Sequence, residues 1–347
     1  MSAQLPELSL LAAGLTCAAG SSRAEALAAY RGPDHFIARN PALIGLDGAP
    51  LTIAAVIAPE EERNELARTY LLIETAFLDM MGQLAARGIR KAAPVTLMLP
   101  PAFNQPQPRD WLAATLRERL GERIGTLGFV HGGAAEAMLA LARLAQTPED
   151  ELGYVIAAES LIPSRAIDDL MSRKRLFSSE NPWGTIPGEA AVALAVLPGR
   201  RENLPGLRLA FAQEPERADD RARGIRGRGL ADALAALRDP AHPPAAIWSD
   251  QNGDRGETEE FGFAVTASGP ELAALADRAE LPMARLGHSG CAMALTSLAL
   301  ALDGPPALVT ASSQGPLRAA ALLLPAPNTG STSNPTSSPA APQEMLP

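Results

Sequence analysis

The chain has 347 residues, 47% of them hydrophobic, which is enough apolar material for one large domain or two coupled halves. Its 30 basic and 39 acidic residues give a net charge of −9, which argues against binding to nucleic acid or to an anionic membrane, since both need a positive surface. The two cysteines, Cys17 and Cys291, lie far apart in a chain too large to need disulfides, so we expect a cytoplasmic protein.

No segment of the sequence has the pattern of a leader or a membrane span. The first apolar run, residues 8–15, follows Glu7 and has no Lys or Arg before it, so it predicts a buried strand and not a signal peptide. The longest apolar run, residues 291–302, contains Thr296 and Ser297 and is shorter than the roughly 18 residues of a membrane helix. It predicts a helix of the core.

Strand-like and helix-like segments alternate along the chain. The pattern predicts an α/β protein built in layers. The expected helices span residues 61–86, 111–122, 133–145, 229–237, 270–278 and 290–302. The expected strands span residues 8–15, 95–99, 154–158, 190–197, 207–211, 245–248, 307–311 and 319–324.

Two sequence features occur twice. His131-Gly132-Gly133-Ala134 reappears in outline as His288-Ser289-Gly290-Cys291, each time before a helix of small apolar residues. A Gly-started, alanine-rich strand that ends in proline occupies residues 188–198 and again 315–325. These repeats predict a duplication with halves at residues 1–198 and 199–325, followed by a disordered Pro/Ser/Thr-rich tail at 326–347.

Three motifs carry a resemblance to a known family. They are Gly188-Glu189-Ala190-Ala191, Gly287-His288 before Ser289-Gly290, and Asn252-Gly253-Asp254. Through them residues 8–325 resemble the thiolase superfamily, specifically the β-ketoacyl-acyl-carrier-protein synthases. The resemblance implies a duplicated five-layer α/β/α/β/α fold and a homodimer.

The chain departs from this family at the positions that perform its chemistry. Where the family has a nucleophilic cysteine before the first buried helix, this chain has His131, and Asn252 stands where a His-Gly-Thr motif would begin. Of the three catalytic positions, only His288 keeps its family identity. A thiolate holds an acyl group as a thioester, whereas imidazole forms only a labile acyl-imidazole, so the resemblance implies a degenerate synthase that does not condense.

Each candidate site residue has a functional and a structural interpretation. His131 and His288 are candidate bases, or else histidines that hold the starts of two buried helices. Cys291 would share a helix face with His288 if both were helical, but a small buried thiol is the commoner role. Asn252 marks the third degenerate position. We expect no cofactor and no metal, because the four histidines lack close ligand spacing.

Three further parts of the sequence have a candidate function. The acidic run from Asp254 to Glu260 could supply a general-acid pair, but a solvated helix start is the commoner role. The arginines between 217 and 228 could bind a phosphate of coenzyme A or of a carrier protein, or simply be solvated. Trp183 could fill the tunnel that an acyl chain would use.

These observations leave three hypotheses about function. The first is a homodimeric, non-condensing protein that acts by binding. The resemblance to degenerate synthases is compatible with a role as an accessory or adaptor of bacterial type VI secretion cargo. The second is an acyltransferase or thioester hydrolase that acts on acyl-coenzyme A or acyl-carrier protein, with His131 or His288 as the base. The third is a partner of an active synthase, similar to a chain length factor.

Overall fold

The computed structural model describes residues 6–45, 47–58, 61–62, 64–148, 150–215 and 227–326. The predicted tail from residue 327 onward and the arginine-rich segment up to residue 226 lie outside these ranges. No helix among the described residues is both long and apolar enough to cross a bilayer.

The chain forms eleven strands and ten α-helices within the described residues. The first part contains β1 (Glu7–Cys17), α1 (Arg23–Arg31), β2 (Ala38–Ile44), β3 (Pro50–Ile53), α2 (Glu65–Ala86), β4 (Ala93–Leu99), α3 (Pro106–Leu120), β5 (Ile124–His131), α4 (Ala134–Leu144), β6 (Gly153–Ser160), α5 (Ser164–Ser172) and β7 (Glu189–Pro198). The second contains β8 (Gly206–Gln213), α6 (Arg228–Ala236), β9 (Ala246–Trp248), α7 (Arg255–Ala267), α8 (Pro270–Ala276), α9 (Met283–Leu286), the short 3₁₀ turn η3 (Gly290–Ala292), α10 (Met293–Ala301), β10 (Ala307–Ser312) and β11 (Leu317–Leu324).

The strand order repeats itself. Nine strands are hydrogen-bonded in the order β5-β4-β6-β7-β1-β8-β11-β10-β9. The strands of this sheet can be renumbered by their order along the chain within each half. Across the sheet, the first half then has the order 3-2-4-5-1, and the second half has the order 1-5-4-2. The fifth strand of each half, β7 or β11, runs antiparallel to its neighbours. The third strand of the second half is reduced to one parallel bridge between Trp248 and Glu280.

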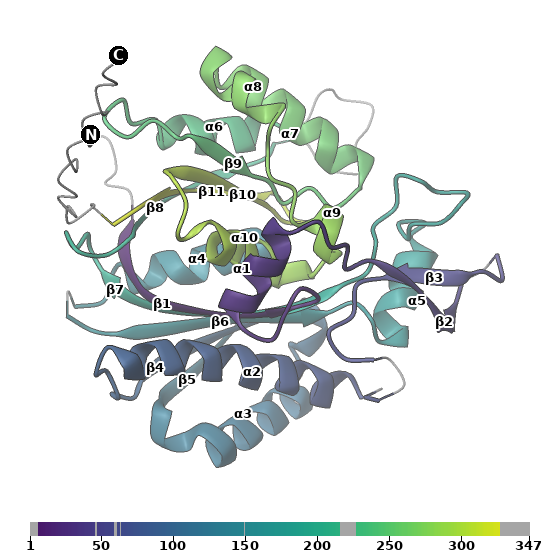
Figure 1. The fold of residues 1–347 in the computed structure, drawn as a ribbon, viewed down its shortest axis with the longest axis horizontal. Helices are drawn as coiled ribbons and strands as arrows, with labels where there is room; N and C mark the ends of the chain where they lie inside the picture. The colour runs from purple at the N-terminus through teal and green to yellow at the C-terminus, as the bar shows by residue number, and fades with distance from the viewer. Residues whose placement is uncertain are drawn as a thin grey trace, which may run out of the picture.

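Three hydrophobic clusters separate five layers. One cluster lies between the sheet of the first half and helices α2 and α3, and another lies between the sheet of the second half and helices α6 and α7. The largest cluster surrounds α4 and α10, which lie between the two parts of the sheet (Figure 1). The predicted duplicated α/β/α/β/α fold is confirmed. We propose that the halves divide after residue 198, where β7 ends and the chain turns toward β8.

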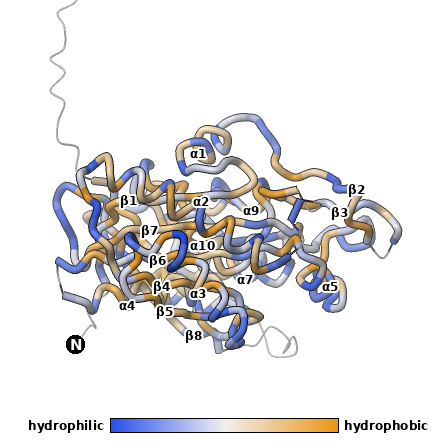
Figure 2. The backbone as a smooth tube through the Cα atoms, turned by 90° about the horizontal axis from the view of Figure 1, so that it is seen from below, coloured by the Kyte–Doolittle hydropathy of each residue, from blue (hydrophilic) through white to orange (hydrophobic). Residues whose placement is uncertain are grey.

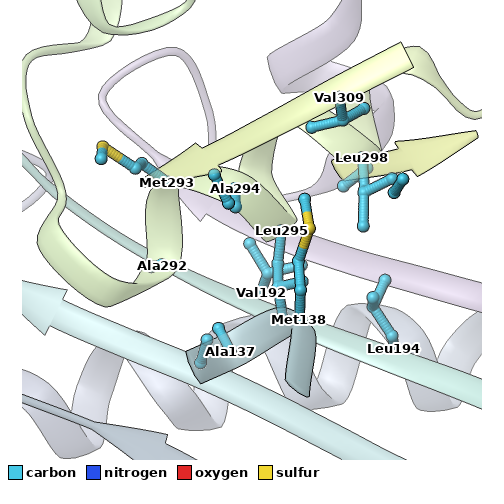
Figure 3. Close-up of a cluster of buried hydrophobic side chains, with 14 of the residues drawn as sticks. Ala137, Met138, Val192, Leu194, Ala292, Met293, Ala294, Leu295, Leu298 and Val309 are labelled. Atoms are coloured by element: carbon cyan, nitrogen blue, oxygen red, sulfur yellow. The ribbon is translucent and has the colours of Figure 1, made fainter. Parts of the chain in front are cut away.

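The two central helices are buried because their sequences are almost entirely apolar: α10 has no charged residue, and α4 has only Glu136 and Arg143. All nine residues of α10 are buried, including Thr296, whose hydroxyl donates to the carbonyl of Ala292. Met138 of α4 and Leu295 of α10 meet side chains of β7 and β10 in the same cluster (Figure 3). In Figure 2 the hydrophobic stretches gather in this middle region. Helices that are apolar on every side can be stable in water only as an inner layer.

Strand β5 differs most from the sequence prediction. The apolar pattern is interrupted by Gly125, Thr126 and Gly128, which are exposed because β5 lies at one edge of the sheet. His131, expected at the start of a helix, is the last residue of this strand and lies opposite Leu99 of β4. The β2–β3 hairpin was also not predicted, and it projects from the side of the layered body next to α5 (Figures 1 and 2).

The surroundings of Gly14 show how closely β1 approaches α2. A Cβ atom on Gly14 would lie 1.9 Å from the carbonyl oxygen of Ala76 and 2.6 Å from the backbone nitrogen of Met80. Backbone cannot move aside as a side chain can, so we expect Gly14→Ala to lower the free energy of unfolding by about 3 kcal/mol. Urea denaturation followed by circular dichroism measures this change.

Gly82 provides the matched control for this substitution. It lies in α2 on the exposed side, and a Cβ there would meet no atom within 4 Å. Gly82→Ala should therefore raise the free energy of unfolding by about 0.5–1 kcal/mol. Equal stability of the Gly14→Ala variant and the native protein would contradict the close packing of β1 on α2.

Candidate functional site

The side chain of His131 points to the outer layer of the first half. Phe129 and His131 lie two residues apart on β5, so they share a face, and their rings stack at 6.4 Å with an angle of 9°. Arg109 of α3 lies 5.3 Å from the Phe129 ring. Val130, on the opposite face, packs against the central cluster instead. The imidazole therefore lies beside α3 and not beside the central helices.

The surroundings of His131 favour the neutral imidazole. Burial and the nearby Arg109 guanidinium lower the pKa of His131, and a hydrogen bond with the backbone of Phe103 partly opposes them. Its Nε2 atom is buried and has no hydrogen-bond partner among the described residues. Such a group can accept a proton only from a donor that reaches the α3 side of the sheet.

The N-terminus of each central helix is capped by the opposite half of the molecule. At α4, the N–H of Ala135 donates to Ser313 Oγ at 3.1 Å, and Ser313 directly follows β10. At η3, the N–H of Cys291 donates to Glu159 Oε2 at 2.6 Å, and Glu159 lies near the end of β6. Strands β6 and β10 are the fourth strands of their halves, so the two caps are equivalent and reciprocal.

Glu159 is held in a close-fitting position. Burial raises the pKa of Glu159 to about 7, while the N–H and thiol of Cys291 oppose this rise and the charge of Glu65 adds to it. Gly290 has a φ angle of +54°, and a Cβ there would lie 1.9 Å from Glu159 Oε2. Only glycine therefore fits beside this carboxyl group.

His288 lies in extended backbone between the two halves. Its N–H donates to the carbonyl of Ile186 at 2.8 Å, and its own carbonyl accepts from the N–H of Gly188 at 2.9 Å. The ring Nδ1 lies 3.1 Å from Met293 Sδ. Burial lowers the pKa of His288 to about 3, and the Arg175 guanidinium lowers it further while Asp254 opposes the shift. The imidazole is therefore neutral at physiological pH.

Asn252 lies in a loop that is linked electrostatically to His288. Its side chain is buried, with Oδ1 accepting from the N–H of Asp254 at 3.0 Å and Nδ2 lacking a partner among the described residues. Asp254 caps α7, which confirms the expected helix start in the acidic run, but the run is not fully solvated because Glu260 is buried in an ion pair with Arg318. Arg175 joins Asp254 at 3.3 Å and Glu257 at 3.1 Å. The loop thus supplies an amide donor without a partner among the described residues, and it is linked to His288 through the charge of Asp254.

One of these charged residues, Arg175, was missed by the sequence reasoning, whereas Glu257 belongs to the acidic run that it had already singled out. Arg175 follows α5 and lies 79 or more positions from its two partners, so no spacing connects them in the sequence. Burial, together with the charge of Asp250, raises the pKa of Glu257 to about 7, although Arg175 opposes the rise. Only the folded chain brings Arg175, Asp254 and His288 into electrostatic contact.

Cys291 is placed as a structural thiol. It is fully buried, and its Sγ lies 3.5 Å from the carbonyl of Ala158 and 3.8 Å from that of Met98. Burial and the neighbouring Glu159 raise the pKa of Cys291 well above its usual value, so the thiol stays protonated. Because His288 is extended and not helical, the condition for a shared helix face is not met.

The structure brings some of the predicted site residues together. His288 and the Asn252–Asp254 loop are neighbours, whereas the contacts found for His131 join it to Leu99, Phe103, Arg109 and Phe129. The Trp183 side chain is 61% exposed, so its ring lies at the surface and does not fill a buried tunnel. Across the described residues, no group of three or more His, Cys, Asp and Glu side chains is placed to hold a metal.

Comparison with known proteins identifies the fold. No protein-family model and no curated protein matches the chain. Solved structures do match: a type II PKS acyl-carrier protein in complex with its ketosynthase (AntDE:AntF; TM-score 0.70, 12% identity) covers 93% of this chain and 100% of its own. The fold is that of the ketosynthases.

Two further matches are complexes of a ketosynthase with a chain length factor. The ishigamide ketosynthase/chain length factor has a TM-score of 0.64 at 19% identity and covers 91% of this chain and 98% of its own. The ketosynthase ApeO in complex with its chain length factor ApeC, from Xenorhabdus doucetiae, has a TM-score of 0.65 at 12% identity, with coverage of 92% and 98%. The chain therefore has the thiolase-like fold predicted from its motifs.

The carboxyl of Glu159 makes stability depend on pH. Its pKa rises from 4.5 to about 7 on folding, so the stability it contributes is complete below pH 4.5 and is lost as the pH rises through 7. Relative to Glu159→Gln, whose amide oxygen can still accept from Cys291, the native protein should lose on the order of 1–3 kcal/mol between pH 5 and pH 8. Parallel urea denaturation at both pH values measures the difference, and a constant difference would contradict the assignment.

The imidazole of His288 should not titrate under mild conditions. Because its pKa is lowered to about 3, the His288 ring signals should stay in the neutral position from pH 8 to pH 5 in an NMR titration. The signal is assigned by its loss in His288→Gln. A midpoint above pH 6 would show that the ring is hydrated or paired with Asp254 in solution.

Proposed function

We propose that this thiolase-fold protein acts by binding and does not catalyse condensation. The observation that carries the proposal is the placement of the two candidate nucleophiles, His131 and Cys291. The imidazole of His131 lies on the α3 side of the sheet, and the thiol of Cys291 is buried, protonated and turned to two backbone carbonyls. Neither group is arranged to hold an acyl chain as a thioester at the start of a central helix.

A partner protein is the ligand that this proposal requires. Strand β5 is at the edge of the sheet, and its residues 125, 126 and 128 are exposed. An exposed edge presents unpaired backbone groups, which supports pairing with β5 of a second copy in a homodimer. Pairing with an active synthase is the heterodimeric form of the same proposal, supported by the ketosynthase and chain length factor complexes of the same fold.

The cellular role that we propose is that of a cytoplasmic accessory. In this role the homodimer binds a protein cargo or adaptor of a bacterial type VI secretion system. The net charge of −9 and the single pair of distant cysteines support a cytoplasmic location and a protein partner.

One observation favours a catalytic alternative. The neutral ring of His288 can accept a proton, and the buried Asn252 Nδ2 is a donor without a partner among the described residues. A base and an amide donor supplied by one site are the groups used to hydrolyse or transfer an acyl group from acyl-coenzyme A or acyl-carrier protein, and the loop that carries Asn252 is linked to His288 through Asp254. In this alternative His288 activates the attacking oxygen and Asn252 stabilises the oxyanion.

Intact-mass measurement tests the proposal directly. The full chain is incubated with acetyl-coenzyme A, octanoyl-coenzyme A or octanoyl-acyl-carrier protein and then analysed by mass spectrometry. We expect no adduct, because no thiol is presented as a thiolate at the central site. A stable adduct that disappears in Cys291→Ser or His131→Ala would overturn the proposal.

The catalytic alternative is tested by release of free thiol from the same substrates. Hydrolysis or transfer should fall at least about a hundredfold in His288→Ala and in Asn252→Ala. His242→Ala is the matched control, because the His242 side chain is 51% exposed and pairs with Asp239 outside the candidate site. Equal rates in all variants, or no release by the native protein, would rule this alternative out.

A further inference from the structure

A cavity lies beneath the β2–β3 hairpin and has no lining residue in common with the candidate site. It has a volume of about 400 Å³ and lies between the β2–β3 hairpin, the end of α5 and residues 176–181. Its walls include the apolar side chains of Leu51, Met171, Leu176 and Phe177, and Leu51 and Leu176 belong to the small core beneath the hairpin. The volume falls in the range of small-molecule sites.

Four charged residues of both signs border this apolar interior. Arg39 and Lys174 are cationic, and Asp47 and Glu180 are anionic. Asp47 already accepts a hydrogen bond from the N–H of Ala49 at 3.0 Å through one oxygen. Across the described residues, no ion pair involves the side chains of Arg39, Lys174 or Glu180. Two charges of each sign around an apolar space match a ligand that also carries both signs.

Lys174 is held in a conformation that lysine rarely adopts. Its φ angle is +55°, and it occupies the position after α5 where the N–H of Lys174 donates to Met171 O at 2.9 Å and that of Arg175 to Leu170 O at 2.8 Å. This is the left-handed position that glycine usually fills at a helix end. The side-chain amide of Asn181 donates to the Lys174 carbonyl at 3.0 Å and stabilises the turn. A lysine in a strained backbone conformation on the wall of a cavity indicates a functional role for that side chain.

We propose that this cavity binds a zwitterionic short peptide of about two residues with apolar side chains and two free ends. The apolar side chains occupy the space beside Leu51 and Phe177. Lys174 and Arg39 bind the carboxylate, and Glu180 and Asp47 bind the ammonium group. This inference is independent of the proposed partner role, because it uses a different surface of the molecule.

Calorimetric titration of the full chain with three matched probes tests the inference. The probes are leucyl-phenylalanine, its N-acetyl derivative without the ammonium group, and its C-terminal amide without the carboxylate. We expect the dipeptide to bind most tightly and each modified probe to bind about fivefold more weakly, the effect of one partly exposed ion pair.

Two variants assign the charges to the two ends. Lys174→Gly should weaken the binding of the dipeptide and of the N-acetyl probe about fivefold but leave the binding of the amide unchanged. Glu180→Gln should weaken the binding of the dipeptide and of the amide about fivefold but leave that of the N-acetyl probe unchanged. Lys174→Gly should also melt at the same temperature as the native protein or higher, because glycine relieves the left-handed turn. Loss of folding therefore cannot imitate loss of the charge.

Arg173→Ala serves as the neighbouring control, because Arg173 does not line the cavity and pairs with Asp169 on the helix surface. It should bind all three probes as the native protein does. Failure of the native chain to bind any probe would overturn the inference. So would equal binding of the three probes, or affinities that neither Lys174→Gly nor Glu180→Gln changes.

Discussion

The reciprocal capping of the two central helices is the interaction on which the rest of the arrangement depends. Helices α4 and α10 are buried among apolar side chains, so the unpaired N–H groups at their starts cannot be satisfied by water. Each half supplies the missing acceptor to the other: Ser313 after β10 to α4, and Glu159 of β6 to the turn before α10. At α4 the helix's own Glu136 also accepts from the N–H of Gly133 at 2.8 Å, but the N–H groups of Ala135 and Cys291 donate to the opposite half, which joins the two halves into one continuous unit.

A buried ion pair fixes each of the two capping turns. Behind Glu159, the neighbouring Ser160 donates to Glu189 at 2.6 Å, and Glu189 is paired with Arg68 at 2.5 Å. Behind Ser313, the guanidinium of Arg318 donates to the Ser313 carbonyl at 3.1 Å and is paired with Glu260. Burying an ion pair costs desolvation free energy, and removing one partner would leave an uncompensated buried charge. The role of these two pairs is therefore to fix the positions of the turns. They hold the caps where the central helices begin.

The same caps explain why the candidate site is polar but short of nucleophiles. Cys291 has a small side chain, and its backbone N–H donates to Glu159. This position encloses the thiol beside the carboxyl group and keeps it protonated. His131 ends an edge strand whose side-chain alternation turns it toward α3, while Val130 takes the face that meets the central layer. What remains near the junction of the halves is a neutral imidazole, His288, and the amide of Asn252, a donor without a partner in the part of the chain that the structure describes. The loop of Asn252 is held by the ion pairs of Arg175 with Asp254 and Glu257.

The sequence by itself determined the layered α/β class, the eight core strands and the duplication, because buried strands and all-apolar helices leave strong local patterns. It could not predict edge strand β5, whose exposed glycines leave no such pattern, or the β2–β3 hairpin with its cavity. The tertiary structure alone decided which way His131 points, which charges surround His288, and that Glu159 and Ser313 cap helices more than a hundred residues away. Those contacts join residues with no fixed spacing, so they exist only once the two halves pack together.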